Sequence, residues 1–185
     1  ADEAHGTHFY FGEDLPVSAM AADADIAAVS MHKSGGSLTQ SSLLLTNKNV
    51  RWEYVAQIIN LTQTTSASYL LMSSLDISRR NLALRGKESF GKVMKMAEYA
   101  RNEINEIGGY YAYGRELNNG SSVFDYDVTK LSVYTRDIGL AGIEVYDLLR
   151  DEYDIQIEFG DIGNILAYIS IGDRIQDIER LVGAL

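Results

Sequence analysis

The sequence predicts the C-terminal part of an α/β unit, followed by a small α+β unit. In the first part of the 185-residue chain, short apolar runs bounded by turn residues alternate with helical patterns, which is typical of an α/β arrangement. After one long helical region, short strands alternate with short helices. We place the boundary near Gly86, with residues 1–86 in the first unit and residues 87–185 in the second, which we expect to be incomplete.

Two short strands are expected early in the first unit. Asp25–Ser30 and Ser41–Thr46 are apolar runs with the length of buried strands. The Gly35–Gly36 pair between them predicts a tight turn, because glycine reaches positive φ without steric cost. His32 and Lys33 should therefore lie just past a strand end, where open α/β sheets place their ligands.

Helices are expected next. Val50–Leu61 is predicted to be a helix, and Ser68–Glu106 a much longer one that is interrupted near Gly86. Gly108–Gly109 should end the longer helix. The first of these helices carries one apolar face, made of Trp52, Val55, Ile58 and Ile59.

The second unit is predicted to contain four strands and two helices. One helix covers Gly142–Arg150, and Asp173 is expected to cap a final helix. The strands are expected at Tyr110–Tyr113, Lys130–Thr135, Ile155–Phe159 and Ile165–Ile171.

Composition excludes several classes of protein. The formal net charge of −10 argues against binding to nucleic acid, which needs clustered Lys and Arg. No apolar stretch approaches the roughly 20 residues that span a bilayer, and no basic run would hold an anionic membrane surface. The absence of cysteine removes disulfides, thiolate catalysis and zinc–thiolate sites, and we expect no metal site. It also suits a reducing compartment, so we expect a soluble cytoplasmic protein.

A small group of polar residues has the chemistry that pyridoxal phosphate (PLP) requires. The cofactor needs a lysine amine for its aldehyde, a carboxylate beside its ring nitrogen and donors for its phosphate. Lys33 could be the amine and Asp2 the carboxylate, while Ser30 and His32 could face the phosphate. His5 follows Asp2 by three residues. When its spacing is considered alone, a solvated surface turn explains the Ser-x-His-Lys tetrapeptide better than a cofactor site does.

The wider pattern resembles a known family. The chain is similar to the ornithine/lysine/arginine decarboxylases, which are PLP enzymes with the aspartate-aminotransferase fold (fold type I), and among them to the shorter bacterial arginine decarboxylases. The similarity extends along the whole chain. It is carried by Asp2–Gly6, Ser30–Ser42, Thr64–Tyr69, Asp127–Leu131 and Gly139–Gly142.

The resemblance implies roles for single residues. Lys33 corresponds to the lysine that forms the Schiff base with PLP, and Asp2 to the carboxylate paired with the pyridinium nitrogen. Ser30 and His32 correspond to the phosphate-side and lysine-side residues of the motif, and His5 to a position against the cofactor. Residues 1–86 would then be the C-terminal part of the PLP-binding large domain.

The same resemblance implies an assembly of subunits. Thr64, Thr65 and Ser66 resemble a loop that reaches the cofactor phosphate of the neighbouring subunit, so the intact enzyme should be at least a homodimer. The hydroxyls of this segment also explain a simple break between two helices. The two interpretations are compatible.

The chain departs from the family pattern in two ways. Ala67 and Val128 stand where the family often has proline, but neither touches a reacting atom. The larger departure is length, because relatives carry most of the large domain upstream of Asp2 and continue beyond Leu185. We therefore expect a fragment that has little or no activity alone.

The resemblance implies decarboxylation of arginine to agmatine and CO2 in polyamine metabolism. Lys33 or His32 would return a proton to the substrate carbon. The substrate's distal cation needs acidic partners. The candidate acidic partners are Glu158, Asp161, Asp125 and Asp127, although each also fits a solvated surface.

Lysine and ornithine remain alternative substrates. Two alternatives to decarboxylation also remain. One is another fold-type I PLP reaction, such as transamination or aldol-type cleavage, and the other is a non-catalytic assembly module.

Overall fold

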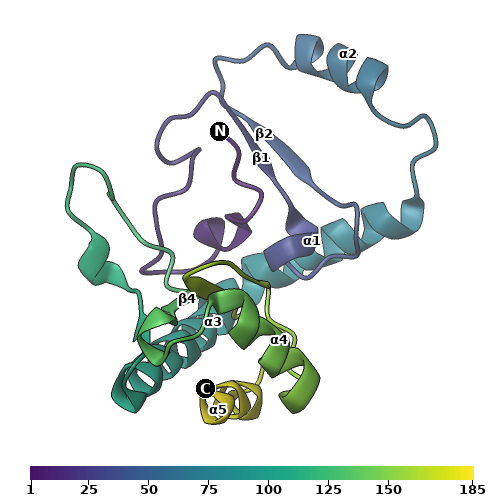
Figure 1. The fold of residues 1–185 in the computed structure, drawn as a ribbon. Helices are drawn as coiled ribbons and strands as arrows, with labels where there is room; N and C mark the ends of the chain where they lie inside the picture. Colours follow the sequence, from purple (N-terminus) through teal and green to yellow (C-terminus); the bar gives the residue numbers. More distant parts are fainter. The chain divides into compact units, whose positions relative to one another are not determined.

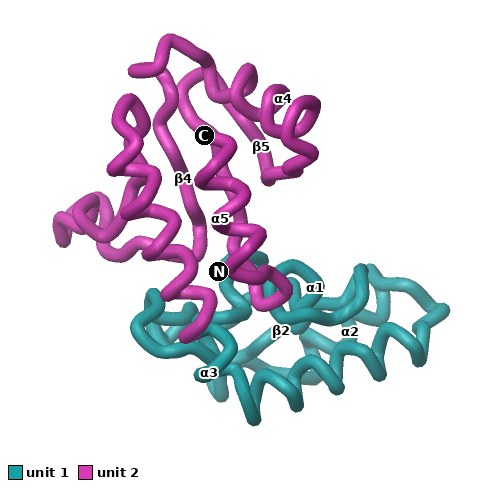
Figure 2. Tube along the Cα trace, turned by 90° about the horizontal axis from the view of Figure 1, so that it is seen from below, with its two compact units in different colours: residues 1–90 teal, residues 91–185 magenta.

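The structure is a computed structural model that describes residues 1–185. The chain forms two compact units, Ala1–Phe90 and Gly91–Leu185, which Figure 2 distinguishes by colour. Both units mix helices with a small sheet, which agrees with the predicted succession of an α/β and an α+β arrangement. No helix is both long enough and apolar enough to cross a membrane.

The sheet of the first unit is built around β1 (Ile26–Val29). It pairs antiparallel with β2 (Leu43–Thr46), so that Val29 lies opposite Leu43. On the other side of β1, Asp2 forms a parallel bridge with Ala28. Because the N-terminal segment runs parallel to β1, the chain leaves both segments toward the same end of the sheet. This end carries the segments that follow Asp2 and Val29.

The connection from β1 to β2 is not the tight turn that the glycine pair predicted. Its first part is α1 (Met31–Ser34), a single helical turn, and only Gly36 of the pair has a positive φ, at 83°. Gly35 has φ −96° and serves another purpose. A Cβ there would lie 2.7 Å from the carbonyl oxygen of Met31 and 2.9 Å from its Cε. Glycine is thus required for close packing against the fully buried Met31.

A short 3-10 helix, η1 (Thr7–Tyr10), contributes two buried residues to the first unit's core. Its His8 is buried, with the ring centroid 5.7 Å from that of Phe90. Beyond it, Phe11 packs on α3 (Tyr69–Ile107) at Gly86, where a Cβ would lie only 2.7 Å from the Phe11 Cβ. The predicted interruption of this helix near Gly86 is wrong: α3 is continuous, and the glycine admits a neighbouring side chain.

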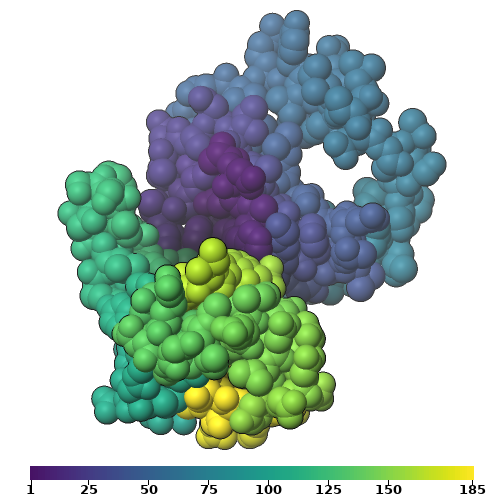
Figure 3. Space-filling model, viewed as in Figure 1, coloured from purple at the N-terminus to yellow at the C-terminus, as the bar shows by residue number.

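The helix predicted at Val50–Leu61 is confirmed as α2 (Trp52–Thr62), but its apolar face is not buried. None of its residues is buried, and Trp52 and Ile58 are each 53% exposed. In Figure 1, α2 and its two connections stand away from β1, β2 and α1. The space-filling view in Figure 3 shows an opening between this segment and the rest of the first unit. The apolar face of α2 therefore has no partner within the unit.

The second unit contains a four-stranded antiparallel sheet in the order β3-β4-β6-β5. The alternating side chains of β4 and β6 place Leu131, Val133 and Ile165 in the core. The C-terminal part of α3 supplies Val93, Ala97, Ala100 and Ile104 to the core of this unit. The strands are β3 (Tyr111–Ala112), β4 (Lys130–Tyr134), β5 (Phe159–Gly160) and β6 (Asn164–Tyr168), and the helices are α4 (Gly142–Tyr153) and α5 (Ile175–Ala184), with 3-10 turns η2 (Arg115–Leu117) and η3 (Arg136–Ile138).

Two predictions for the second unit are wrong in detail. The expected strand Ile155–Phe159 is reduced to β5, because Asp154 has a left-handed φ of 53° and the Ile155 N–H still donates to Leu149 of α4. Asp173 does not cap α5, since its carboxylate accepts the Ser170 N–H at 2.6 Å. The start of α5 is instead capped by Asp177, whose carboxylate accepts the Arg174 N–H at 3.0 Å.

Candidate cofactor site around Lys33

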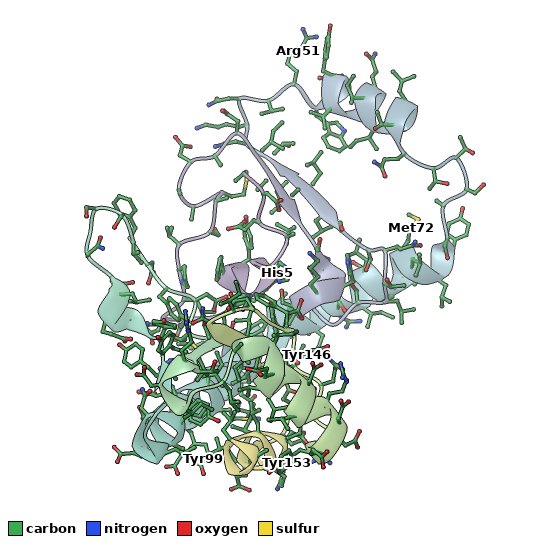
Figure 4. All side chains as sticks on the ribbon, viewed as in Figure 1. His5, Arg51, Met72, Tyr99, Tyr146 and Tyr153 are labelled. Carbon is green, nitrogen blue, oxygen red and sulfur yellow. The ribbon has the colours of Figure 1, made fainter.

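Lys33 lies in α1, directly beyond the carboxyl end of β1. Its Nζ lies 3.2 Å from Nε2 of His5, which comes from the segment after the Asp2 bridge. Figure 4 labels His5, near η1 and α1. Both side chains are exposed in this chain. The structure therefore brings together a lysine and a histidine that are far apart in the sequence.

Asp2 lies beside β1 through its parallel bridge to Ala28. The Glu3 N–H donates to the Ala28 carbonyl at 2.9 Å, and the Ala28 N–H donates to the Ala1 carbonyl at 3.1 Å. One carboxylate oxygen of Asp2 accepts the Ala4 N–H at 3.0 Å. The other oxygen has no hydrogen bond within the chain and is free to hold a protonated nitrogen.

Ser30 and His32 flank the same strand end. The carbonyl of Ser30 accepts the Thr7 hydroxyl at 3.2 Å, which ties η1 to the end of β1, while the Ser30 hydroxyl has no hydrogen bond within the chain. His32 is half-buried, and its Nδ1 lies 2.9 Å from the Ser41 carbonyl oxygen. An amine, a free carboxylate oxygen, a free hydroxyl and two imidazoles form a donor set that fits PLP.

Thr64, Thr65 and Ser66 are not part of this group. They lie in the exposed connection between α2 and α3, which Figure 1 shows well away from α1. The Ser66 N–H donates to the Thr64 hydroxyl at 3.1 Å, as expected for hydroxyl-bearing residues that break a helix. Their predicted contact with a cofactor in a neighbouring subunit stays a prediction, as do the cofactor contacts of Lys33 and Asp2.

Three residues near the site were not predicted from the sequence. Glu3 accepts the Tyr10 hydroxyl at 2.5 Å and the Ala19 N–H at 2.7 Å, and so fixes the segment between Asp2 and His5. Thr7 is fully buried and holds Ser30, as described above. Ser41 contacts His32 through its backbone carbonyl, and no sequence pattern reveals a carbonyl contact.

The acidic candidates for the substrate's distal cation differ in how they are engaged. Asp127 forms a half-buried ion pair with Lys130 at 2.9 Å, and Asp161 accepts the N–H groups of Gly163 and Asn164. These backbone bonds lower the pKa of the exposed Asp161 carboxyl. Asp125 accepts the side chain of Asn118 at 3.3 Å. Glu158 is exposed and has no side-chain hydrogen bond, so it alone of the four is unengaged. No group of three or more His, Asp or Glu side chains could hold a metal ion.

Known proteins share this fold. A lysine decarboxylase from Francisella novicida superposes with a TM-score of 0.82 at 19% identity, covering 100% of this chain and 31% of that protein. A NifS-like protein from Rickettsia africae superposes with a TM-score of 0.63 at 14% identity, covering 99% of this chain and 51% of that one. These similarities confirm the predicted fold class, that of part of a PLP fold-type I enzyme.

Curated sequences give the closer relationship. The arginine decarboxylases of Halalkalibacterium halodurans and Bacillus subtilis are 45% and 44% identical over 100% of this chain. The chain spans 38% of the length of each of them. The family model described as Orn/Lys/Arg decarboxylase, major domain, matches residues 1–128, which include Asp2, His5 and the Ser30–Lys33 segment. The chain belongs to the Orn/Lys/Arg decarboxylase family.

Proposed function

We propose that the full-length protein is a PLP-dependent arginine decarboxylase that forms agmatine and CO2 in polyamine metabolism. The observation that carries the proposal is the Lys33 amine, 3.2 Å from His5, beyond a strand that is bridged by Asp2. Because the chain belongs to the decarboxylase family, we assign to this amine the role of the lysine that forms the Schiff base with PLP. We place the protein in the cytoplasm, in keeping with the absence of cysteine.

PLP, when bound, supplies an electron sink for the electron pair that departing CO2 leaves behind. The Lys33 Nζ would hold the cofactor aldehyde, and the free oxygen of Asp2 would keep a proton on the ring nitrogen, because a nearby negative charge favours the protonated form. The Ser30 hydroxyl is suited to donate to the phosphate. The proton that replaces CO2 on the substrate would come from Lys33 Nζ or from His32.

The relatives favour arginine over lysine and ornithine as the substrate. Arginine decarboxylases match the chain at 43–45% identity, whereas the lysine decarboxylases that share its fold are 18–19% identical. We further propose that Thr64–Ser66 completes the site of a second subunit, which makes the working enzyme at least a homodimer.

The test compares full-length wild-type protein with Lys33→Ala and Lys48→Ala variants. Lys48 is also exposed, and it lies on the connection that precedes α2. We expect an absorbance band near the visible with added PLP in the wild type and in Lys48→Ala, and its loss in Lys33→Ala. Agmatine formation should fall by at least about 100-fold in Lys33→Ala, the size of effect that removal of a proton-transfer group produces.

Product analysis separates this proposal from its alternatives. Cadaverine or putrescine as the main product, from lysine or ornithine, would change the substrate. Keto-acid formation without CO2 release would indicate another PLP reaction. The 185 residues alone should form little or no agmatine, because Asp2, His5 and Lys33 are exposed and PLP would lack further protein contacts.

A further inference from the structure

His32 donates two hydrogen bonds to a single carbonyl. The backbone N–H of His32 lies 3.2 Å from the Ser41 oxygen, and the ring Nδ1 lies 2.9 Å from the same atom. Ser41 comes just before β2, nine residues along the chain, so this double contact closes the loop that carries Lys33. The ring is therefore anchored at one nitrogen.

The chemistry of a carbonyl decides which ring nitrogen bears the hydrogen. A carbonyl oxygen only accepts hydrogen bonds, so the Nδ1 that faces it must carry the proton in the neutral imidazole. Nε2 is then left with its lone pair. A proton taken up by this ring must bind at Nε2, and the resulting imidazolium keeps its Nδ1–H bond to Ser41.

The turn that presents the Ser41 carbonyl has its own internal hydrogen bonds. The hydroxyls of Ser37 and Ser41 lie 2.5 Å apart, and the Ser41 hydroxyl also donates to the Leu38 carbonyl. The Leu38 N–H in turn donates to the Ser74 hydroxyl of α3 at 2.7 Å. Ser37 and Ser41 are both buried, so these bonds replace contacts with water and give the turn a fixed shape.

Gln40 has an unusual backbone conformation within this turn. Its φ is +58°, in the left-handed region that costs a non-glycine residue about 1–3 kcal/mol and persists only where the surroundings enforce it. Gln40 immediately precedes Ser41, so this strained angle lies next to the residue whose carbonyl contacts His32.

We propose that the turn Ser37–Ser41 is a positioning device that holds His32 in its Nδ1–H tautomer, so that Nε2 alone exchanges protons at the Lys33 site. Gln40 and Ser41 are positioning residues, since they act through His32. The catalytic use of Nε2 rests on the proposed arginine decarboxylase. The tautomer itself does not, because it follows from the hydrogen bonds of this chain.

The direct test is nitrogen-15 NMR of the ring nitrogens in the histidine-labelled chain. The sequence has three histidines, so the spectrum is simple, and a His32→Asn variant assigns the resonances of His32. We expect a pyrrole-type shift at Nδ1 of neutral His32 and a pyridine-type shift at Nε2. The reverse pattern, or averaged shifts at both nitrogens, would refute the proposal.

Two substitutions at one position test the role of the turn. Gln40→Gly tolerates a positive φ and should keep the Nδ1–H tautomer, whereas Gln40→Val disfavours that φ and should give averaged shifts. Ser42→Ala, at an exposed neighbouring residue, should resemble the wild type. Amide spectra verify that each variant is folded, and an unchanged tautomer in folded Gln40→Val would contradict the role given to Gln40.

Kinetics of the full-length protein connect the tautomer to the reaction. Gln40→Val should lower kcat by about 10-fold or more with KM changed less, since substrate binding does not use this turn, and Gln40→Gly should stay near wild type. Equal kcat values for Gln40→Val and Gln40→Gly would refute a role of the turn in the reaction. If the NMR result stands and the protein releases no CO2 from arginine, the proposed function fails while the tautomer assignment holds.

Discussion

Glu3 and Tyr10 hold the segment that carries Asp2 and His5. One oxygen of the Glu3 carboxylate accepts the Tyr10 hydroxyl and the other accepts the Ala19 N–H. Burial and the neighbouring carboxylate raise the pKa of Tyr10 to about 12, because both disfavour the tyrosinate. This pair therefore links the geometry of the candidate site to a titration that can be measured.

The pair predicts how stability depends on alkaline pH. A pKa raised above its ordinary value of 10.0 contributes stability that is complete below pH 10 and is lost as the pH rises toward about 12. Tyr10→Phe removes the hydrogen bond and should lower the free energy of unfolding by about 1 kcal/mol at pH 8. Denaturant titrations of both proteins should show this difference shrinking between pH 10 and 12. A difference that stays constant with pH would argue against the pair.

Two glycines of α3 make a matched pair for packing. A Cβ at Gly86 would meet Phe11 at 2.7 Å, whereas one at Gly91 would meet nothing within 4 Å. Gly86→Ala should therefore destabilise the protein by about 1–3 kcal/mol through overpacking. Gly91→Ala should stabilise it by up to about 1 kcal/mol, because alanine favours the helix. Urea midpoints compare the two, and equal signs for both changes would contradict the packing described for Gly86.

At the scale of elements, α2 is the part of the first unit with the least support. It has no buried residue, and the connections on either side of it are largely exposed. Segments with few buried contacts open locally at low cost and are the preferred sites of proteolysis. Lys48 and Arg51 lie in the connection that leads into α2.

We expect limited trypsin digestion to cut first after Lys48 or Arg51. Mass spectrometry of the first products locates the cut, and a Lys48→Gln, Arg51→Gln double variant should survive several times longer. Early cleavage within α4 or α5 would show instead that the second unit opens more easily than this segment.

Periodicity and breaker residues predicted most elements. Alternation located β4, and the glycine pair Gly108–Gly109, both with positive φ, ends α3 as expected. The errors arose where one residue type serves several purposes. A turn was predicted at Gly35 and a helix break at Gly86, but both glycines make room for neighbouring side chains. Distinguishing these uses requires knowing what packs against the glycine, which local sequence does not contain.

At the scale of the molecule, the site was partly predictable. Lys33 follows a predicted strand, so the apolar run before it was enough to place it at a strand end. The Ser41 contact to His32 was not predictable, because every residue has a carbonyl and only the tertiary turn selects one. Thr64–Ser66 could be read as a helix break from its hydroxyls, whereas a role in a second subunit has no signal in one chain.

The charge of the whole molecule gives a further prediction. With a formal net charge of −10, the chain should pass through a heparin column unretained in low salt, since phosphate- and sulfate-rich polymers bind through clustered cations. An anion exchanger is the control and should retain it. Retention on heparin that is lost at higher salt would reveal a basic surface and contradict the absence of nucleic-acid binding expected from the sequence.

The outer strands of the sheet in the second unit are very short. Its two outer strands, β3 and β5, contain two residues each, while the inner strands β4 and β6 contain five each. Unpaired backbone groups on long outer strands are what recruits further strands into fibrils, and short outer strands remove that template. Amyloid-like growth from the folded second unit is thereby disfavoured.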